Sequence, residues 1–411
     1  MTDENAEPVT EPASSFDHRK ARQTVLVLAF AQALSMTGAS IVMLVTALAG
    51  AYLAPDPRLA TLPLAVQFVA TMLTTFPAAL WMKRAGRRLG FTFGQFVGIG
   101  GGSIGCYALL QGSFALLIVS AILLGAHNAF WGYYRFAAAE AAPPDKRAKA
   151  ISLVMAGGIF SAVFGPELAK ATRDLFSPVV FAGCYAAIAA LSAFTVCLIQ
   201  TAALTKPIQV PVSDETVERP LSEVMRQPKF IVAAISAMVG YGVMILVMSA
   251  TPLSMVDCGF AFEDAAFVIQ WHALAMFGPS FFTGSLIKKF GAVRIVLVGV
   301  VLNVGSMASN LAGIELINFW LGLVALGLGW NFMFIGGTAL LTETYRQSEQ
   351  EKTQAANDFL VFATISVATF SSGALQNGFG WVAVNGAMVL PLTVALCAVL
   401  WLTVQQRQAA S

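Results

Sequence analysis

Arg135 lies within the long apolar segment 114–139, where a charged side chain is rare. Placing a charge at the centre of a membrane costs about 2.5–3.5 kcal/mol on insertion scales, so Arg135 is expected to face a cavity or a partner. Asn128 and Trp131 precede it at helical spacing and should share its helix face. A guanidinium beside an indole can bind a planar, anionic or carbonyl-rich molecule. The structural alternative is that Arg135 pairs with Glu140 or reaches the membrane surface.

Two histidines in apolar segments are further candidates for ligand binding. His127 flanks the face of Arg135, and His272 lies 205 positions after Gln67. Polar groups at related positions could line one cavity, although hydrogen bonds between packed helices would explain them equally well. Aromatic side chains could supply walls for a flat ligand. The substrate-binding candidates are Arg135, Trp131, Asn128, His127, His272, Gln67, Asn331, Phe334 and Tyr241.

Four side chains could carry a proton through an apolar segment: His127, His272, Glu167 and Asp358. A histidine titrates near neutral pH, which suits it to this role. The structural alternative for Glu167 is an ion pair with Lys170 one turn later. The structural alternative for Asp358 is stabilisation of its carboxylate by the dipole of a helix that is expected to begin at about residue 356.

The chain contains an internal repeat. Residues 79–88 and 284–293 are separated by 205 positions, and each ends one apolar segment and precedes another. Lys83, Arg84 and Gly86 match Lys288, Lys289 and Gly291. The relation extends, at an offset of 203, to Asn128 with Asn331, Trp131 with Phe334, Arg135 with Thr338, and Glu140 with Glu343. A basic turn repeated in two apolar halves is typical of transporters built from two related bundles.

Composition and segment length indicate an all-α integral membrane protein. Hydrophobic residues make up 57% of the chain and charged residues 11%, against roughly 25% charged residues in soluble domains. A helix needs about 20 apolar residues to cross a bilayer. We predict twelve transmembrane helices in two six-helix bundles related by a pseudo-twofold axis. They span roughly 23–53, 60–82, 90–111, 114–139, 149–169, 177–201, 229–254, 263–287, 293–312, 315–341, 356–376 and 380–404.

The distribution of positive charge predicts the orientation. Twenty of the 24 Lys and Arg residues fall on the tails, the central loop and alternate turns, and three fall on the other turns. By the positive-inside rule both termini are cytoplasmic. The expected organisation is a tail (1–22), a first bundle (23–201), a central loop (202–228), a second bundle (229–404) and a tail (405–411).

The basic turn resembles the motif G-x-x-x-D-R-x-G-R-R of the major facilitator superfamily. The sequence matches it at Arg84, Gly86, Arg87 and Arg88, and departs at Ala79 and Lys83. Because Lys83 replaces the usual Asp, other acids should complete the cytoplasmic gate. The resemblance implies a gate formed by Arg84, Gly86, Arg87, Arg88, Lys288, Lys289, Gly291, Glu140 and Glu343. The segments 270–272 and 354–359 are similar to a bacterial subgroup that includes proposed riboflavin carriers.

The expected function is secondary active transport of a small organic solute by alternating access, and the sequence leaves open whether protons are coupled to it. The subgroup resemblance implies a planar, polar aromatic substrate such as a flavin. The alternatives are a multidrug or metabolite exporter of the same fold, or a non-transporting membrane receptor. No Walker or HExxH motif occurs, so we predict neither an enzyme nor a cofactor. We expect a monomer in the bacterial inner membrane, without nucleic-acid or metal partners.

Overall fold

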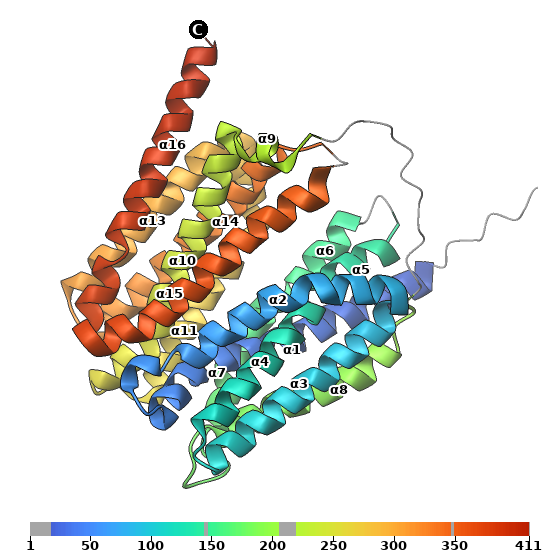
Figure 1. Ribbon diagram of the computed structural model, residues 1–411, viewed down its shortest axis with the longest axis vertical. Helices are drawn as coiled ribbons and strands as arrows, with labels where there is room; N and C mark the ends of the chain where they lie inside the picture. Colours follow the sequence, from blue (N-terminus) through green and yellow to red (C-terminus); the bar gives the residue numbers. More distant parts are fainter. Residues whose placement is uncertain (1–17, 144–146, 205–218, 347–348, 411) are drawn as a thin grey trace, which may run out of the picture.

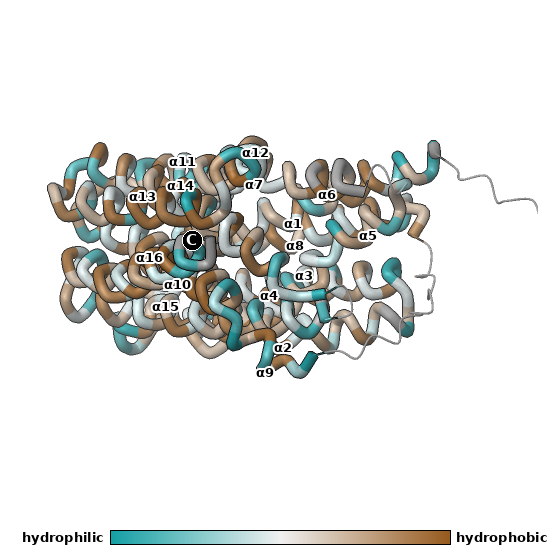
Figure 2. The backbone as a smooth tube through the Cα atoms, turned by 90° about the horizontal axis from the view of Figure 1, so that it is seen from above, coloured by the Kyte–Doolittle hydropathy of each residue, from teal (hydrophilic) through white to brown (hydrophobic). Residues whose placement is uncertain are grey.

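The computed structural model describes residues 18–143, 147–204, 219–346 and 349–410. These parts of the chain form helices, joined by short turns. Two helical bundles lie side by side and diverge from one shared end (Figure 1). Viewed from above, hydrophobic residues predominate along the helices of both bundles (Figure 2).

The first bundle contains eight helices. They are α1 (His18–Leu53), α2 (Leu62–Ala85), α3 (Arg87–Leu110), α4 (Phe114–Trp131), α5 (Tyr134–Ala141), α6 (Arg147–Met155), α7 (Gly157–Thr172) and α8 (Ala182–Gln200), with a short 3₁₀ helix, η1 (Pro57–Leu59), before α2.

A short helix, α9 (Leu221–Met225), leads into the second bundle. That bundle comprises α10 (Pro228–Asp257), α11 (Phe262–Phe277), α12 (Ser280–Phe290), α13 (Ala292–Ala312), α14 (Leu316–Thr342), α15 (Gln350–Gly386) and α16 (Val389–Ala410).

Among the described residues, ten helical segments are long and apolar enough to cross a membrane, and a bent pair makes eleven. The bent pair is α11 and α12, whose axes differ by 42°. One of the ten segments, Lys352–Gln406, holds both α15 and α16. Gly380 departs from helical geometry inside it (φ 79°), at the turn that the sequence predicted. Counted separately, these two helices complete the predicted twelve.

The internal repeat is visible in the backbone. Gly86 separates α2 from α3 with φ 96° and ψ 154°, and Gly291 separates α12 from α13 with φ 87° and ψ 148°. A side chain is strained at such positive φ, so glycine permits this sharp turn. The two basic turns therefore share one conformation.

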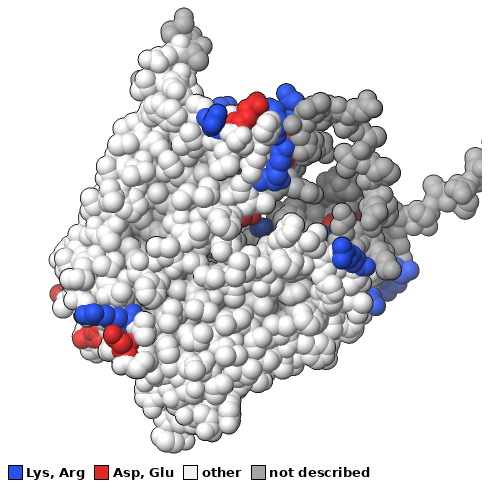
Figure 3. All heavy atoms as spheres, in the orientation of Figure 1, with Lys and Arg blue, Asp and Glu red and all other residues white. Residues whose placement is uncertain are grey.

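Charged residues divide the surface into zones. Figure 3 shows charged atoms at two opposite ends, separated by a broad band without charge. Exposed apolar side chains such as Phe76, Phe194 and Val382 are typical of a lipid-facing surface. We call the end that carries the basic turns at residues 84–88 and 288–294 the basic end.

Candidate functional site

The two bundles enclose a hollow that opens at the basic end. The space-filling view shows this hollow, with acidic and basic atoms inside it (Figure 3). At the opposite end the bundles are joined directly. Thr61 Oγ1, at the start of α2, donates to Thr369 O of α15 at 2.7 Å and accepts from Gly373 N at 3.0 Å. Asn377 Nδ2 donates to Pro57 O at 2.8 Å. The structure is therefore closed at one end and open at the other.

An arginine and an aspartate from opposite bundles interact electrostatically in this hollow. Arg135 is on α5 and Asp358 is on α15, and both side chains are exposed. Arg135 stacks over the Phe136 ring, with 4.8 Å from its guanidinium carbon to the ring centroid. In the described part of the chain Arg135 has no hydrogen-bond partner, because Glu140 pairs with Arg87 instead. Its guanidinium is thus available to a ligand.

The second bundle supplies an aromatic wall beside this charge. The Trp330 and Phe334 rings of α14 stack with centroids 5.2 Å apart and planes 9° apart. The Tyr241 ring of α10 meets them edge-on, at 5.3 and 5.4 Å. Tyr241 also interacts electrostatically with Arg135. Trp330 Nε1 is buried and has no hydrogen-bond partner in the described chain. Phe334 and Tyr241 are half-buried and can contact a flat ring, whereas Trp330 is 6% exposed and packs against both of them in the core.

Asn128 and Trp131 are bonded to each other. Trp131 Nε1 donates to Asn128 Oδ1 at 2.9 Å. The helix breaks at Gly132 and Tyr133, so Arg135 belongs to the next helix and not to a single continuous face. Both side chains remain partly exposed, one helix before the arginine.

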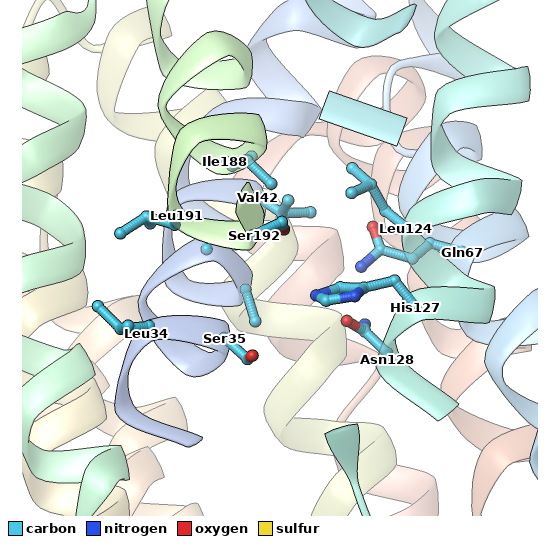
Figure 4. Close-up of a pocket in the computed structure, with 12 residues that line it drawn as sticks. Leu34, Ser35, Val42, Gln67, Leu124, His127, Asn128, Ile188, Leu191 and Ser192 are labelled. Atoms are coloured by element: carbon cyan, nitrogen blue, oxygen red, sulfur yellow. The ribbon is translucent and has the colours of Figure 1, made fainter. Parts of the chain in front are cut away.

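His127 and Gln67 face a pocket inside the first bundle. Figure 4 shows His127, Gln67 and Asn128 extending toward this pocket, which residues of α1, α2, α4 and α8 line. His127 Nδ1 bonds to Gly94 O at 2.9 Å, and Gln67 Oε1 has no partner among the described residues. Both side chains are buried, so they belong to the packing of the first bundle and not to the hollow between bundles.

His272 and Asn331 are buried inside the second bundle. His272 Nδ1 bonds to Leu323 O at 2.7 Å. Asn331 Nδ2 donates to Met276 O at 2.6 Å and to Ser280 Oγ at 2.8 Å, and its Oδ1 accepts from Thr283 at 2.7 Å. These bonds bridge the bend between α11 and α12, so the amide of Asn331 is fully occupied.

Glu167 and Asp358, the two proposed proton carriers that are not histidines, lie in different parts of the molecule. Glu167 lies far from the hollow and pairs with Lys170 at 2.6 Å, as its structural alternative requires. Asp358 is exposed and interacts electrostatically with Arg135 and Tyr133 of the other bundle. The helix around it begins at Gln350, earlier than the predicted 356, so Asp358 lies well inside α15. The dipole explanation for Asp358 is therefore wrong, because the dipole effect fades within the first turn.

The gate residues form separate networks at the basic end of each bundle. Arg87 Nη2 donates to Glu140 Oε1 at 2.6 Å, and Arg88 donates to Ala202 O. In the second bundle Glu343 accepts from Lys229 Nζ at 2.6 Å. Arg84, Lys288 and Lys289 are exposed. The side chain of Lys83, which replaces the motif's acid, lies outside the described residues.

Sequence reasoning missed a buried ion pair at the basic end. Glu349 is 0% exposed and accepts from Arg219 at 2.6 Å through Nη2 and at 2.9 Å through Nε. The Arg219 guanidinium, followed by the backbone N–H of Arg346, holds the pKa of Glu349 well below its usual range. Arg219 also donates to Thr344 O at 3.1 Å. These bonds fasten the end of the central loop to the second bundle.

Interbundle contacts at the closed end were also missed. Arg173 of the first bundle pairs with Glu263 of the second at 3.6 Å and lies over the Phe262 ring at 5.0 Å. The only available signal was the presence of isolated charges on turns that are otherwise poor in charge. Sequence spacing cannot show that turns from different halves meet.

Comparison with known proteins agrees with this architecture. A family model for the Major Facilitator Superfamily matches residues 28–357. The chain is 37% identical over 395 residues to a riboflavin transporter, RfnT, of Brucella anthropi, covering 96% of this chain and 99% of that protein. It is 27% identical to YdeG, an uncharacterized transporter of the same superfamily from Bacillus subtilis, covering 89% of this chain and 88% of that protein.

A solved structure with the same fold is a bacterial homologue of the human lysosomal transporter Spinster in an inward-facing, occupied conformation. It superposes with a TM-score of 0.69 at 16% identity, covering 93% of this chain and 96% of that one. The unoccupied, inward-facing form of that homologue gives a TM-score of 0.70. With the repeated basic turns, the paired bundles and the family match, this chain belongs to the major facilitator superfamily.

Proposed function

We propose that this transporter carries a flavin across the bacterial inner membrane, with its substrate bound between Arg135 and the aromatic wall. The observation that carries the proposal is the hollow itself. It combines the Arg135 guanidinium of the first bundle, which has no hydrogen-bond partner in the described chain, with the Tyr241 phenol and the Phe334 ring of the second bundle. The 37% identity to a riboflavin transporter over nearly the whole chain supports the choice of a flavin.

The chemistry of the site suits this substrate. A flavin ring is flat and carries carbonyl and N–H groups along one edge. The guanidinium of Arg135 can donate two parallel hydrogen bonds to such an edge, while Phe334 and Tyr241 present aromatic surface. Because the two bundles contribute different parts of the site, rocking one bundle against the other would dismantle it and release the substrate.

We further propose that the basic end faces the cytoplasm, so that the described conformation is inward-facing. The positive-inside rule supports this orientation. A reporter fused to the C-terminus of α16 should be accessible only from the cytoplasmic side. Access from the periplasm would reverse the proposed orientation.

The test is uptake of riboflavin, followed by its fluorescence, into sealed proteoliposomes containing purified protein. Uptake above that of empty vesicles is expected, whereas binding without uptake would indicate a receptor. Arg135→Gln should weaken riboflavin binding about ten- to a hundredfold, because a hydrogen bond to a charged group contributes about 1.5–3 kcal/mol.

Arg58→Gln is the matched control, since Arg58 lies in η1 at the closed end and should leave binding unchanged. Unaltered binding by Arg135→Gln would contradict the assigned role of Arg135. Absence of any flavin binding by the wild-type protein would reject the proposed substrate.

A further inference from the structure

Two opposite charges on different bundles lie near each other. Arg135 of α5 and Asp358 of α15 interact electrostatically, and both side chains are exposed. A second guanidinium, that of Arg87, lies 5.7 Å from the Tyr133 ring centroid beside them. Arg87 is already paired with Glu140, through bonds of 2.6 and 3.3 Å. Each guanidinium in this region therefore has one carboxylate to offset its charge.

The carboxylate of Asp358 is itself weakly engaged. Its one hydrogen bond in the described chain is from Asn357 Nδ2, at 3.4 Å. In the described chain no arginine donates a hydrogen bond to Asp358, whereas Arg219 donates hydrogen bonds to Glu349. An exposed, weakly bonded carboxylate acts on whatever enters the hollow, and it repels anions.

We propose that Asp358 sets the charge selectivity of the hollow, so that an uncharged aromatic solute is accepted and an anionic one is excluded. For the proposed flavin substrate, on which this part rests, the consequence is selection of riboflavin over its phosphate ester. A phosphate monoester brings about −1.5 to −2 charges at pH 7. Arg135 cannot offset that charge while it also offsets Asp358, and a repulsive group of this kind is a common source of specificity.

The first test compares riboflavin and its 5′-phosphate by quenching of flavin fluorescence on the purified protein. The wild-type protein should bind riboflavin at least tenfold more tightly than the phosphate. Asp358→Asn should reduce that ratio about tenfold, chiefly by tightening the binding of the phosphate. Glu167→Gln, which removes a carboxylate at the opposite end, is the matched control and should leave the ratio unchanged.

Two results would overturn the proposal. One is an unchanged ratio in Asp358→Asn. The other is equal loss of both ligands in a variant that keeps the wild-type melting temperature, because Asp358 would then be a direct contact of the ring and not a charge filter.

A second test does not depend on the substrate. The five native cysteines are replaced, and a single cysteine is placed at Thr338, an exposed position one helical turn beyond Phe334. Its rates of modification by anionic and cationic methanethiosulfonates then report the potential in the hollow. Asp358→Asn should raise the anion-to-cation rate ratio about tenfold.

An unchanged ratio of rates would refute the charge filter even if flavins bind. A raised ratio in a protein that binds no flavin would retain the filter and reject the proposed flavin substrate. The two failures are therefore distinguishable.

Discussion

Two charged residues in this chain show how surroundings decide the role of a charge. Glu349 is buried and receives bonds from Arg219 and from the backbone N–H of Arg346, so its charge is satisfied within the protein. Arg135 is exposed, stacks on Phe136 and interacts electrostatically with Asp358, but it has no hydrogen-bond partner in the described chain. A buried charge with hydrogen-bond partners in the protein links the elements that carry those partners, whereas a charge without such partners is available to bind a ligand.

The ion pair of Glu349 should make the second bundle sensitive to acid. The pKa of Glu349 is lowered in the folded protein. Its stabilising effect is therefore fully present above the ordinary carboxyl pKa of 4.5 and is lost progressively as pH falls from there toward the folded-state pKa. Glu349→Gln should therefore lower the melting temperature at pH 7. The difference from wild type should narrow progressively below about pH 4.5.

Glu343→Gln provides the control, because the Glu343–Lys229 pair is exposed at the same end and such pairs contribute little. Melting curves by intrinsic fluorescence across pH 3–8 would measure both variants. A difference for Glu349→Gln that stayed constant at every pH would show that the pair's charge is not the source of stability.

At the scale of single helices, glycine sets how closely α3 approaches its neighbours. A Cβ added at Gly102 would lie 2.7 Å from the backbone nitrogen of Ala189 in α8. Backbone atoms cannot relieve such a contact by changing rotamer, as a side chain can. Gly102 therefore permits the close packing of α3 against α8.

Gly102→Val should destabilise the first bundle by about 1–3 kcal/mol, the usual cost of overpacking. Gly100→Val is the matched control in the same helix, since the nearest atom to its added Cβ is 3.9 Å away. Thermal unfolding in detergent would compare them. Equal melting temperatures would mean that α3 and α8 can separate without cost.

For the whole molecule, the closed end determines which conformation is populated. Thr61 is fully buried there and bonds to α15 as both donor and acceptor. When the bundles rock apart at this end, these interbundle bonds must break. They therefore stabilise the conformation that is open at the basic end.

Thr61→Val should shift the equilibrium toward opening of the closed end, because it removes both interbundle hydrogen bonds of Thr61, each of which contributes about 0.5–1.5 kcal/mol. Spin labels at Leu175 and Phe379, two exposed positions on opposite bundles, would report the separation by pulsed electron resonance. A larger fraction of long distances is expected. Thr61→Ser keeps the hydroxyl and should resemble wild type, and an identical distribution for Thr61→Val would disprove the latching role.

The length and position of the helices were largely predictable. Apolar runs and basic turns predicted the spans and the turn near Gly380, because a bilayer demands long apolar helices. Boundaries were less certain, as α15 shows by beginning at Gln350. Polar residues such as Gln354 can continue a helix beyond the membrane, so hydropathy alone places that start too late.

The sequence by itself determined a membrane protein of two related halves and identified Arg135 as an unusual charge. It could do so because the composition of each segment reflects whether that segment lies in lipid or in water. Only the tertiary structure decided the partners of that charge. In the structure Asp358 interacts electrostatically with Arg135, and Glu140 forms an ion pair with Arg87. His127 and His272 are each buried within their own bundle. These outcomes depend on how distant helices pack and rotate, and contacts between residues hundreds of positions apart leave no mark in local spacing.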